Sequence, residues 1–255
     1  MRLAILSDIH GNKVAFDAVL KDLSACGDFD AIWILGDLCA FGPEAHACLE
    51  SIYALIEQYG KDTVKVIGGN TDRYLVTGER SPSPFIENET DFQKFVTTTS
   101  IKDTILNWNL ADLTYADYSF LMPLLGKELR KKVADFGTIL AVHAVPGDDE
   151  SMALRPDTPD EEALDVLMDR EACLFLVGHT HIRMDRKIGN RRVINPGSVG
   201  MSLTQKTVAE WAILTFQEAD LEVDFRDVPY DFDLALQTTL DRAYPEPEWL
   251  INILK

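Results

Sequence analysis

Short apolar segments recur along the chain, and each of them runs into glycine or a polar residue. They cover residues 3–6, 31–35, 64–67, 139–142 and 173–177. Runs of four or five residues rich in Ile, Val and Leu are typical of strands that are buried on both faces. We therefore expect five strands in the interior of the protein.

Amphipathic segments lie between these strands. Residues 14–23 and 45–60 carry apolar side chains at helical spacing. Asn12 is in place to cap the first of these helices, and Gly60 is in place to end the second. Residues 158–161 (TPDE) form a capping box with proline at the first helical position, which predicts a third helix.

This third helix is expected to run to about Arg170. Strands that alternate with helices favour an α/β fold with a largely parallel sheet.

Residues 84–131 break the alternation and predict a helical insertion of two or three helices. One of them begins at a capping box over residues 114–117 and stops before Pro123. Residues 208–228 predict a β-hairpin at the edge of the sheet. We expect residues 1–255 to form a single domain that contains both features.

The composition limits the classes of partner. The net charge of −18 argues against duplex nucleic acid and against an anionic membrane surface, because both need a basic face. Bound cations would still allow a phosphate-bearing substrate. The four cysteines are scattered, and no apolar run approaches the length of a membrane span. We expect a cytoplasmic protein.

Polar side chains follow the ends of the predicted strands, and four of the five histidines are among them. In open α/β sheets, ligands bind beyond the carboxyl ends of the strands. Seven nitrogen and oxygen ligands are too many for one tetrahedral zinc, and they suit two divalent ions that share a carboxylate. A set without thiolate favours Mn, Fe, Co, Ni or Zn. The seven candidates are Asp8, His10, Asp37, Asn70, His143, His179 and His181.

These residues form five motifs in a fixed order: Asp8-x-His10, Gly36-Asp37, Gly69-Asn70-x-Asp72, His143 and Gly178-His179-x-His181. The order resembles that of the calcineurin-like metallophosphoesterases. The resemblance covers residues 3 to about 200 and includes NPGS at residues 195–198. It implies a four-layer αββα fold, in which two stacked mixed sheets are flanked by helices.

The resemblance also implies a role for each ligand. One ion would be held by Asp8, His10 and His181, the other by Asn70, His143 and His179, with Asp37 bridging the two. A hydroxide that bridges the ions would attack phosphorus in line, and the ions would neutralise the equatorial oxygens.

The third motif departs from the family pattern. Many members carry a histidine after the asparagine, thought to protonate the leaving oxygen, and here the position is Thr71. A threonine hydroxyl is too weak an acid for that role at neutral pH. The small prokaryotic phosphodiesterases of the family also lack this histidine, and the loop at residues 36–43 resembles theirs. We therefore expect phosphodiesters or nucleotides with good leaving groups as substrates. His46 could replace the lost acid, but it lies on a predicted helix.

Residues beside the ligands are candidates for catalysis and substrate binding. We expect Asp37, Asn70 and Asp72 to be catalytic, with Asp72 orienting a ligand or a water. Arg73 would contact phosphate oxygens, although a plain salt bridge is the alternative for Asp72 and Arg73. Phe41 would line the substrate mouth or pack within its loop. The expected substrate contacts are Asn12, Phe41, Thr71 and Arg73.

Two other functions remain open at this point. A nucleotide anhydride, such as a dinucleoside polyphosphate, also has a good leaving group. A catalytically weak scaffold of the same fold would bind a protein partner instead, and the missing histidine leaves room for it. A complete set of seven ligands favours the enzyme. We expect a phosphate ester or nucleotide as the ligand, and a homo-oligomer is a further expectation.

Overall fold

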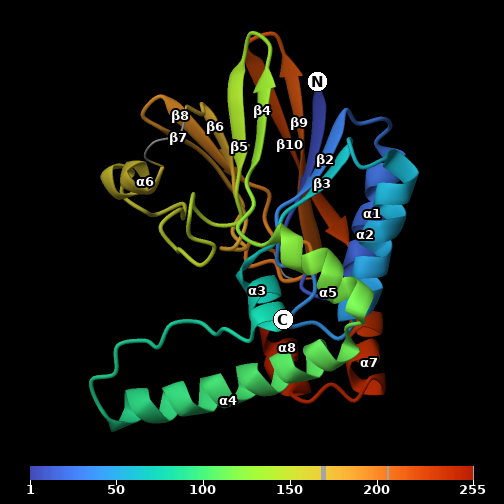
Figure 1. The fold of residues 1–255 in the computed structure, drawn as a ribbon, viewed down its shortest axis with the longest axis vertical. Coiled ribbons are helices and arrows are strands. Elements are labelled where there is room, and N and C mark those ends of the chain that lie inside the picture. The colour runs from blue at the N-terminus through green and yellow to red at the C-terminus, as the bar shows by residue number, and fades with distance from the viewer. Residues whose placement is uncertain (168–170, 206, 255) are drawn as a thin grey trace.

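The first of two five-stranded sheets has the strand order β10-β9-β1-β2-β3 (Figure 1). The structure is a computed structural model that describes residues 1–167, 171–205 and 207–254. Strands β1, β2 and β3 are parallel, and the β9–β10 hairpin adds to β1 in the antiparallel direction. The bounds are β1 (Arg2–Leu6), β2 (Ala31–Ile34), β3 (Val64–Val66), β9 (Val208–Gln217) and β10 (Asp220–Pro229).

The second sheet has the order β4-β5-β6-β8-β7. Its three central strands are parallel, and both edge strands are antiparallel. Both sheets are therefore mixed, so the expectation of one largely parallel sheet was wrong. The bounds are β4 (Leu129–Val133), β5 (Gly137–Ala141), β6 (Leu174–Leu176), β7 (Met184–Ile188) and β8 (Arg191–Asn195).

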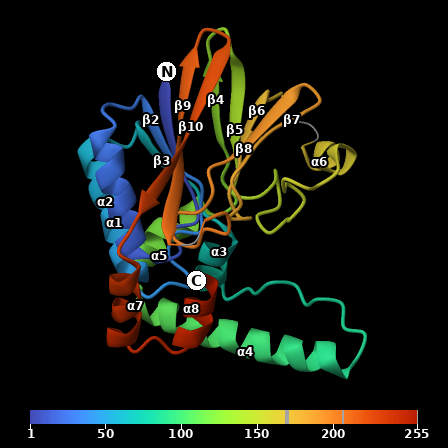
Figure 2. The same ribbon diagram turned by 180° about the vertical axis from the view of Figure 1, so that it is seen from behind.

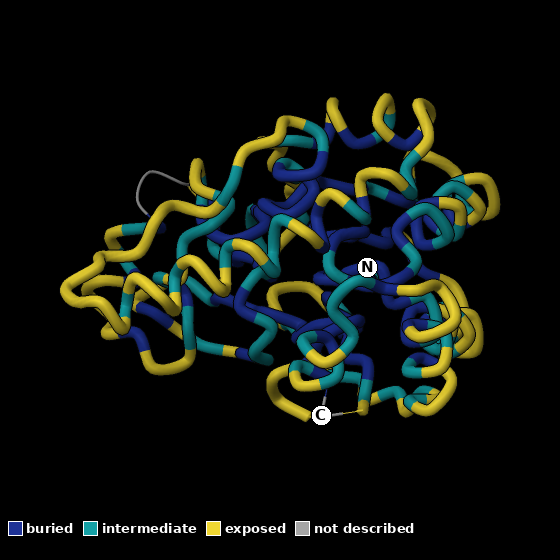
Figure 3. Tube along the Cα trace, turned by 90° about the horizontal axis from the view of Figure 1, so that it is seen from below, coloured by how far each residue is buried: buried dark blue, intermediate teal, exposed yellow. Residues whose placement is uncertain are grey.

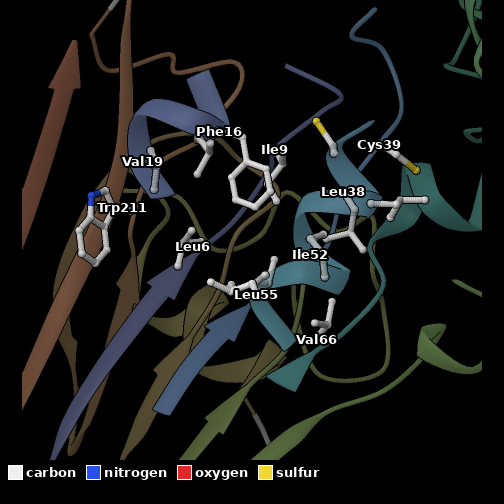
Figure 4. Close-up of a cluster of buried hydrophobic side chains, with 14 of the residues drawn as sticks. Leu6, Ile9, Phe16, Val19, Leu38, Cys39, Ile52, Leu55, Val66 and Trp211 are labelled. Carbon is white, nitrogen blue, oxygen red and sulfur yellow. The ribbon is translucent and has the colours of Figure 1, made fainter. Parts of the chain in front are cut away.

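Apolar side chains on both faces of the strands explain the layers. In β1, Leu3 and Ile5 belong to the core between the sheets, whereas Ala4 and Leu6 belong to the core beneath the helices. The core beneath the helices also contains Phe16, Val19 and Trp211 (Figure 4). Helices α1 (Lys13–Ala25) and α2 (Ala45–Tyr59) cover the first sheet, and α6 (Asp160–Val166) lies beside the second (Figures 1 and 2). The αββα fold is confirmed.

Three of the four predicted helix signals are confirmed, including the capping box at residues 114–117, which begins the helix over Tyr115–Leu121. Asn12 caps α1, because its side chain accepts a hydrogen bond from the backbone N–H of Ala15. Gly60 follows the last residue of α2. The signal at residues 158–161 was wrong by one position: Pro159 is the N-cap of α6, and the Thr158 hydroxyl instead accepts from the backbone N–H of Arg155 at 3.1 Å. The expected end near Arg170 lies outside the described residues.

The segment predicted as a helical insertion contains α4 (Glu89–Asp112), α5 (Tyr115–Leu121) and the short 3-10 helix η1 (Met122–Leu124). Its expected end at residue 131 was wrong, because residues 129–131 already pair with β5 as part of β4. In α4 only Ile105, Leu106 and Asn109 are buried, all toward its C-terminal end. The N-terminal part of α4 extends away from the body, and residues 79–88 run beside it (Figures 1 and 2).

Three further helices lie at the end of the molecule where α4 is found (Figures 1 and 2). They are α3 (Asn70–Thr77), α7 (Phe232–Asp241) and α8 (Pro247–Leu254). Leu250 and Leu254 of α8 share a small core with Ile105 of α4 and with Tyr244. The buried part of the trace is concentrated inside the molecule (Figure 3). Among the helices described, none combines the length and apolar character that crossing a membrane requires.

Candidate metal centre

The seven candidate ligands come together at the carboxyl ends of strands from both sheets. The first sheet supplies four of them, after β1, β2 and β3, and the second sheet supplies three, after β5 and β6. Asp8, His10, Asp37 and His181 form one cluster, and Asp37, His143 and His179 form a second. Asp37 belongs to both, and Asn70 borders the second cluster.

The two oxygens of Asp37 face different clusters. Oδ2 lies 3.5 Å from His10 Nε2, and Oδ1 lies 3.4 Å from His143 Nε2. Asn70 Oδ1 completes the second cluster at 3.2 Å from His143 Nε2 and 3.0 Å from His179 Nδ1. Asp37 is therefore placed to bind two cations at once.

Backbone carbonyls fix the orientation of all four imidazoles. Each ring uses one nitrogen to donate a hydrogen bond to a carbonyl, and its other nitrogen faces the cluster. A partner of this kind sets the tautomer of a metal-binding histidine. The contacts are His10 Nδ1 to Ala40 O at 2.9 Å, His143 Nδ1 to Leu35 O at 2.7 Å, His181 Nδ1 to Met201 O at 2.9 Å and His179 Nε2 to Glu150 O at 2.9 Å.

Two of the rings meet directly, since His10 Nε2 lies 2.8 Å from His181 Nε2. Both rings donate through Nδ1, so in their neutral form both Nε2 atoms present lone pairs to each other. Two facing lone pairs repel unless a cation or a proton lies between them. The donor set of imidazole nitrogens and carboxylate oxygens fits a divalent transition metal at this point.

The charges of the site agree with a cation site. Burial works against the charge of Asp37, but the imidazoles of His143 and His10 hold the pKa of its carboxyl below the usual range. Burial lowers the pKa of His10 to about 4, so this ring is neutral at pH 7. For His143 burial acts in the same direction, but the Asp37 and Asp8 carboxylates raise its pKa to about 10. Without metal, His143 therefore favours its positively charged imidazolium form.

Five of the seven candidates occupy the left-handed region of backbone conformation. The values of φ are 57° for Asp8, 50° for His10, 51° for Asp37, 65° for His179 and 55° for His181. Such residues cost about 1–3 kcal/mol each and cluster at functional sites. Hydrogen bonds between neighbouring loops hold the geometry: the N–H of Asp8 donates to Gly36 O at 3.0 Å, and that of His10 to Asp37 O at 2.9 Å.

Gly69 allows the third motif to approach the centre. A Cβ atom at this position would meet Asp37 Oδ1, and it would lie 2.5 Å from Asp37 N and 2.7 Å from His143 Cε1. Only glycine fits here, because any side chain would displace the shared carboxylate.

Comparison with known proteins identifies the family. The pattern of the calcineurin-like phosphoesterase superfamily domain matches residues 1–219. The chain belongs to this superfamily. Its members are metallophosphoesterases, and the clustered aspartates and histidines agree with metal binding.

Several relatives of this metallophosphoesterase match nearly its whole length. The uncharacterized protein MJ0912 of Methanocaldococcus jannaschii is 29% identical and covers 97% of this chain and 95% of its own. The hypothetical protein PH1004 of Pyrococcus horikoshii OT3 has a TM-score of 0.78 at 23% identity, covering 99% of this chain and 97% of that one. A metallophosphoesterase from Sphaerobacter thermophilus has a TM-score of 0.70 at 24% identity, covering 100% and 98%.

A shorter match relates the metallophosphoesterase to proteins of named activity. The symmetrical bis(5'-nucleosyl)-tetraphosphatase of Chromohalobacter salexigens is 27% identical over 103 residues. This match covers 40% of the present chain and 35% of the relative.

Two residues expected beside the metals are used to hold the loops of the phosphoesterase. Asp72 accepts hydrogen bonds from the backbone N–H groups of Leu38 and Gly69, both at 2.9 Å. It thereby ties the loop of Asp37 to that of Asn70. Asn12 caps α1, and its Nδ2 donates to Gly200 O at 3.0 Å. The structure therefore gives Asp72 and Asn12 positioning contacts, and their direct part in catalysis or binding stays a prediction.

Thr71 and Arg73 occupy different environments. The backbone N–H of Thr71 donates to Asp37 Oδ1 at 2.9 Å, while its buried hydroxyl has no hydrogen-bond partner among the described residues. The guanidinium of Arg73 is paired with Glu79, with Asp149 at 2.7 Å and with Glu150 at 2.5 Å. Phosphate binding by Arg73 therefore requires that these ion pairs open.

Phe41 lies at the edge of the centre, where its ring centroid is 6.0 Å from that of His10. Its N–H donates to Asn109 Oδ1 at 2.9 Å, and Asn109 Nδ2 donates to Gly42 O at 2.8 Å. Sequence reasoning did not find Asn109, because nothing in the sequence pairs α4 with this loop. The carbonyls that orient the imidazoles were missed as well, since every residue type carries a carbonyl.

His46 lies apart from the metal centre. It belongs to α2, and its Nδ1 is 2.8 Å from Asp117 Oδ2 of the capping box that starts α5. It therefore has a structural partner, and it does not stand in for the histidine absent at position 71.

Proposed function

We propose that this metallophosphoesterase hydrolyses phosphodiesters with two divalent transition-metal ions. The observation that carries the proposal is the placement of Asp37 Oδ2 beside His10 and of Asp37 Oδ1 beside His143. Asp8, His10 and His181 would hold one ion, Asn70, His143 and His179 would hold the other, and Asp37 would serve both. Mn, Fe, Co, Ni and Zn suit this donor set.

The ions, when bound, supply positive charge for the phosphoryl oxygens and lower the pKa of water. The chain supplies the alignment. The carbonyls of Leu35, Ala40 and Met201 fix three of the imidazoles, and Asp72 holds the loops that carry Asp37 and Asn70. Preorganised groups of this kind need no rearrangement during the reaction.

The preference for diesters over monoesters rests on the lack of a general acid. All five histidines are described: four face the centre, and His46 is bound to Asp117. The Thr71 hydroxyl can donate a hydrogen bond to a leaving oxygen but does not supply a proton at neutral pH. Leaving groups that depart as anions are therefore favoured, as in aryl and nucleotidyl diesters.

A nucleotide anhydride is the second candidate substrate. A phosphate or nucleotide is a leaving group that needs no protonation, so the same site would suit it. The partial similarity to symmetrical bis(5'-nucleosyl)-tetraphosphatases supports this candidate.

The test compares an aryl phosphodiester with an aryl phosphomonoester, using metal-stripped protein reloaded with Mn, Ni, Co, Zn or Mg. We expect metal-dependent hydrolysis with the diester preferred, and its loss in His179→Ala. His46→Gln serves as the matched control, because this histidine lies outside the centre.

A preference for the monoester would contradict the diester assignment, and faster hydrolysis of diadenosine tetraphosphate would favour the anhydride. Protein that binds two ions but turns over none of these compounds would point to a scaffold of the same fold. Binding of a single ion would contradict the dinuclear centre.

A further inference from the structure

A cavity of about 440 Å³ lies between α4 and the residues that run beside its N-terminal part. This volume falls within the ~300–1,000 Å³ of ligand sites in proteins. Arg80 fastens the two walls together, because its Nε donates to Asp103 Oδ1 of α4 at 2.6 Å. The apolar part of the lining includes Phe41, Phe85, Phe95 and Leu106.

The cavity also carries positive charge that is not neutralised. Lys94 and Lys102 line it, and neither forms an ion pair or hydrogen bond with a residue that the structure describes. Of its two carboxylates, Asp103 is paired with Arg80, and Asp91 accepts a hydrogen bond from Asn88 Nδ2 at 2.9 Å but keeps its charge, so the charged side chains of the lining leave one net positive charge. In a chain with a net charge of −18, two free ammonium groups beside aromatic rings favour a ligand that is both flat and anionic.

Two residues of the cavity wall connect it to the metal centre. Phe41 lines the cavity, and its ring lies 6.0 Å from that of His10. Tyr74 lines it as well and donates a hydrogen bond from its hydroxyl to the carboxylate of Glu150. The carbonyl of Glu150 in turn holds His179 through Nε2 at 2.9 Å. A molecule in the cavity would therefore contact Phe41 and Tyr74, through which the cavity is connected to the metal centre.

We propose that this cavity binds the nucleoside part of a nucleotide-containing phosphoester. The base stacks on the Phe85 and Phe95 rings, since aromatic side chains bind any base through its π-face. Lys102, which lies nearer than Phe95 to the buried end of α4, attracts the phosphate, which lies toward the metals. Thr98 and Thr99, also in the lining, offer hydroxyls to the polar edge of the base. This inference rests on the function proposed above and assigns the helical insertion to substrate selection.

The test uses two diesters with the same leaving group, thymidine 5'-(p-nitrophenyl) phosphate and methyl p-nitrophenyl phosphate, with metal-loaded protein. We expect wild type to prefer the thymidine ester in kcat/KM. Phe95→Ala should lower this preference by about tenfold, because stacking on an aromatic ring is lost. Phe92→Ala is the matched control: it lies on the same helix, is 45% exposed and does not line the cavity, so the preference should stay within about twofold.

A second readout does not depend on turnover. Calorimetry should show that adenosine 5'-monophosphate binds metal-loaded wild type about tenfold more tightly than methyl phosphate does, and that Phe85→Ala and Phe95→Ala lose this difference. Phe85 is 87% exposed, so its removal leaves the folded core intact. Lys102→Gln should weaken binding of the nucleotide but not of adenosine.

The outcomes separate this inference from the proposed function. If wild type hydrolyses neither ester, the proposed function fails, and the binding measurements alone decide the inference. Hydrolysis with an unchanged preference in Phe95→Ala would overturn the inference and leave the proposed function standing. If Phe85→Ala or Phe95→Ala dissociates an oligomer of the wild type, the cavity is an interface between copies of the chain, and the inference is wrong.

Discussion

The Nε2 atoms of His10 and His181 lie 2.8 Å apart, although the residues are 171 positions apart in the chain. Both rings donate their other N–H to a backbone carbonyl, His10 to Ala40 and His181 to Met201. The fold thus brings two electron-rich nitrogens together and prevents either ring from turning away. A cation between them removes the repulsion.

Metal binding should therefore stabilise the fold. We expect metal-stripped protein to melt at a lower temperature, with the melting temperature rising on addition of Mn or Zn. A ligand present at a hundred times its Kd stabilises by about 2.7 kcal/mol. Calorimetric melting over a series of free-metal concentrations measures this effect. The shift should persist in His46→Gln and shrink in His181→Gln, and an equal shift in both variants would place the ion elsewhere.

Asp37→Asn should affect both clusters at once, because Asp37 faces His10 and His143 with different oxygens. Loss of a residue that merely orients a ligand costs about 10–100-fold in metal affinity or activity, so we expect losing the shared ligand to cost about a hundredfold or more. Elemental analysis and kinetics measure the two effects. Asp17→Asn is the control, since Asp17 is exposed and, among the described residues, pairs only with Lys13 on α1. Full occupancy of two ions in Asp37→Asn would argue against the shared role.

Gly69→Ala should disrupt the metal centre, because the added methyl group would clash with two of the candidate ligands. The added Cβ would lie 2.7 Å from His143 Cε1 and would also meet the Asp37 carboxylate. Such overpacking costs about 1–3 kcal/mol of stability, and here it should also abolish metal-dependent hydrolysis. The neighbouring Gly68→Ala is the matched control, because its closest contact is the flexible end of Leu125 at 3.1 Å. Urea denaturation and activity assays of both variants measure the difference, and equal behaviour would contradict the close approach.

Asp117 gives a prediction for pH. Burial disfavours the charge of this carboxylate, but hydrogen bonds from Thr114, Tyr53 and His46 lower its pKa below the ordinary value of 3.8. A carboxylate with a lowered pKa stabilises the fold above pH 3.8, and the contribution is lost as the pH falls through the folded-state pKa. Wild type should thus exceed Asp117→Asn in stability by an amount that is greatest above pH 4 and declines in more acidic solution.

Urea denaturation of both proteins at a series of pH values measures that difference. Asp22→Asn provides a comparison, since Asp22 is half-buried and pairs with Arg226 outside this network. A difference that grew as the pH fell would contradict the lowered pKa of Asp117.

The sequence predicted the strand ends well, because a strand buried on both faces must be apolar and must then end in polar residues. Asp8 and His179 stand out for that reason. It did not predict the partition into two sheets, because periodicity describes the faces of one strand and not which strands pair. β4 (LRKKV) was missed because it is an edge strand with three exposed residues.

The sequence predicted the candidate ligands much better than the residues that hold them in position. Asp72 was noticed for its place in the third motif, but its partners are the backbone N–H groups of Leu38 and Gly69, which carry no residue signal. Asn109 reads as an ordinary polar residue of a helix. Only the packing of α4 against the loop of Phe41 shows what Asn109 does.

The division of the ligands between two sheets has a consequence for folding. Asp8, His10, Asp37 and Asn70 follow strands of one sheet, and His143, His179 and His181 follow strands of the other. Under the ligand assignment proposed above, neither sheet alone would carry a complete set for either ion. Metal ions bound in this way would take their final coordination only after the sheets have docked, so loading would report the last stage of assembly, and the ions would tie the two halves of the sandwich together.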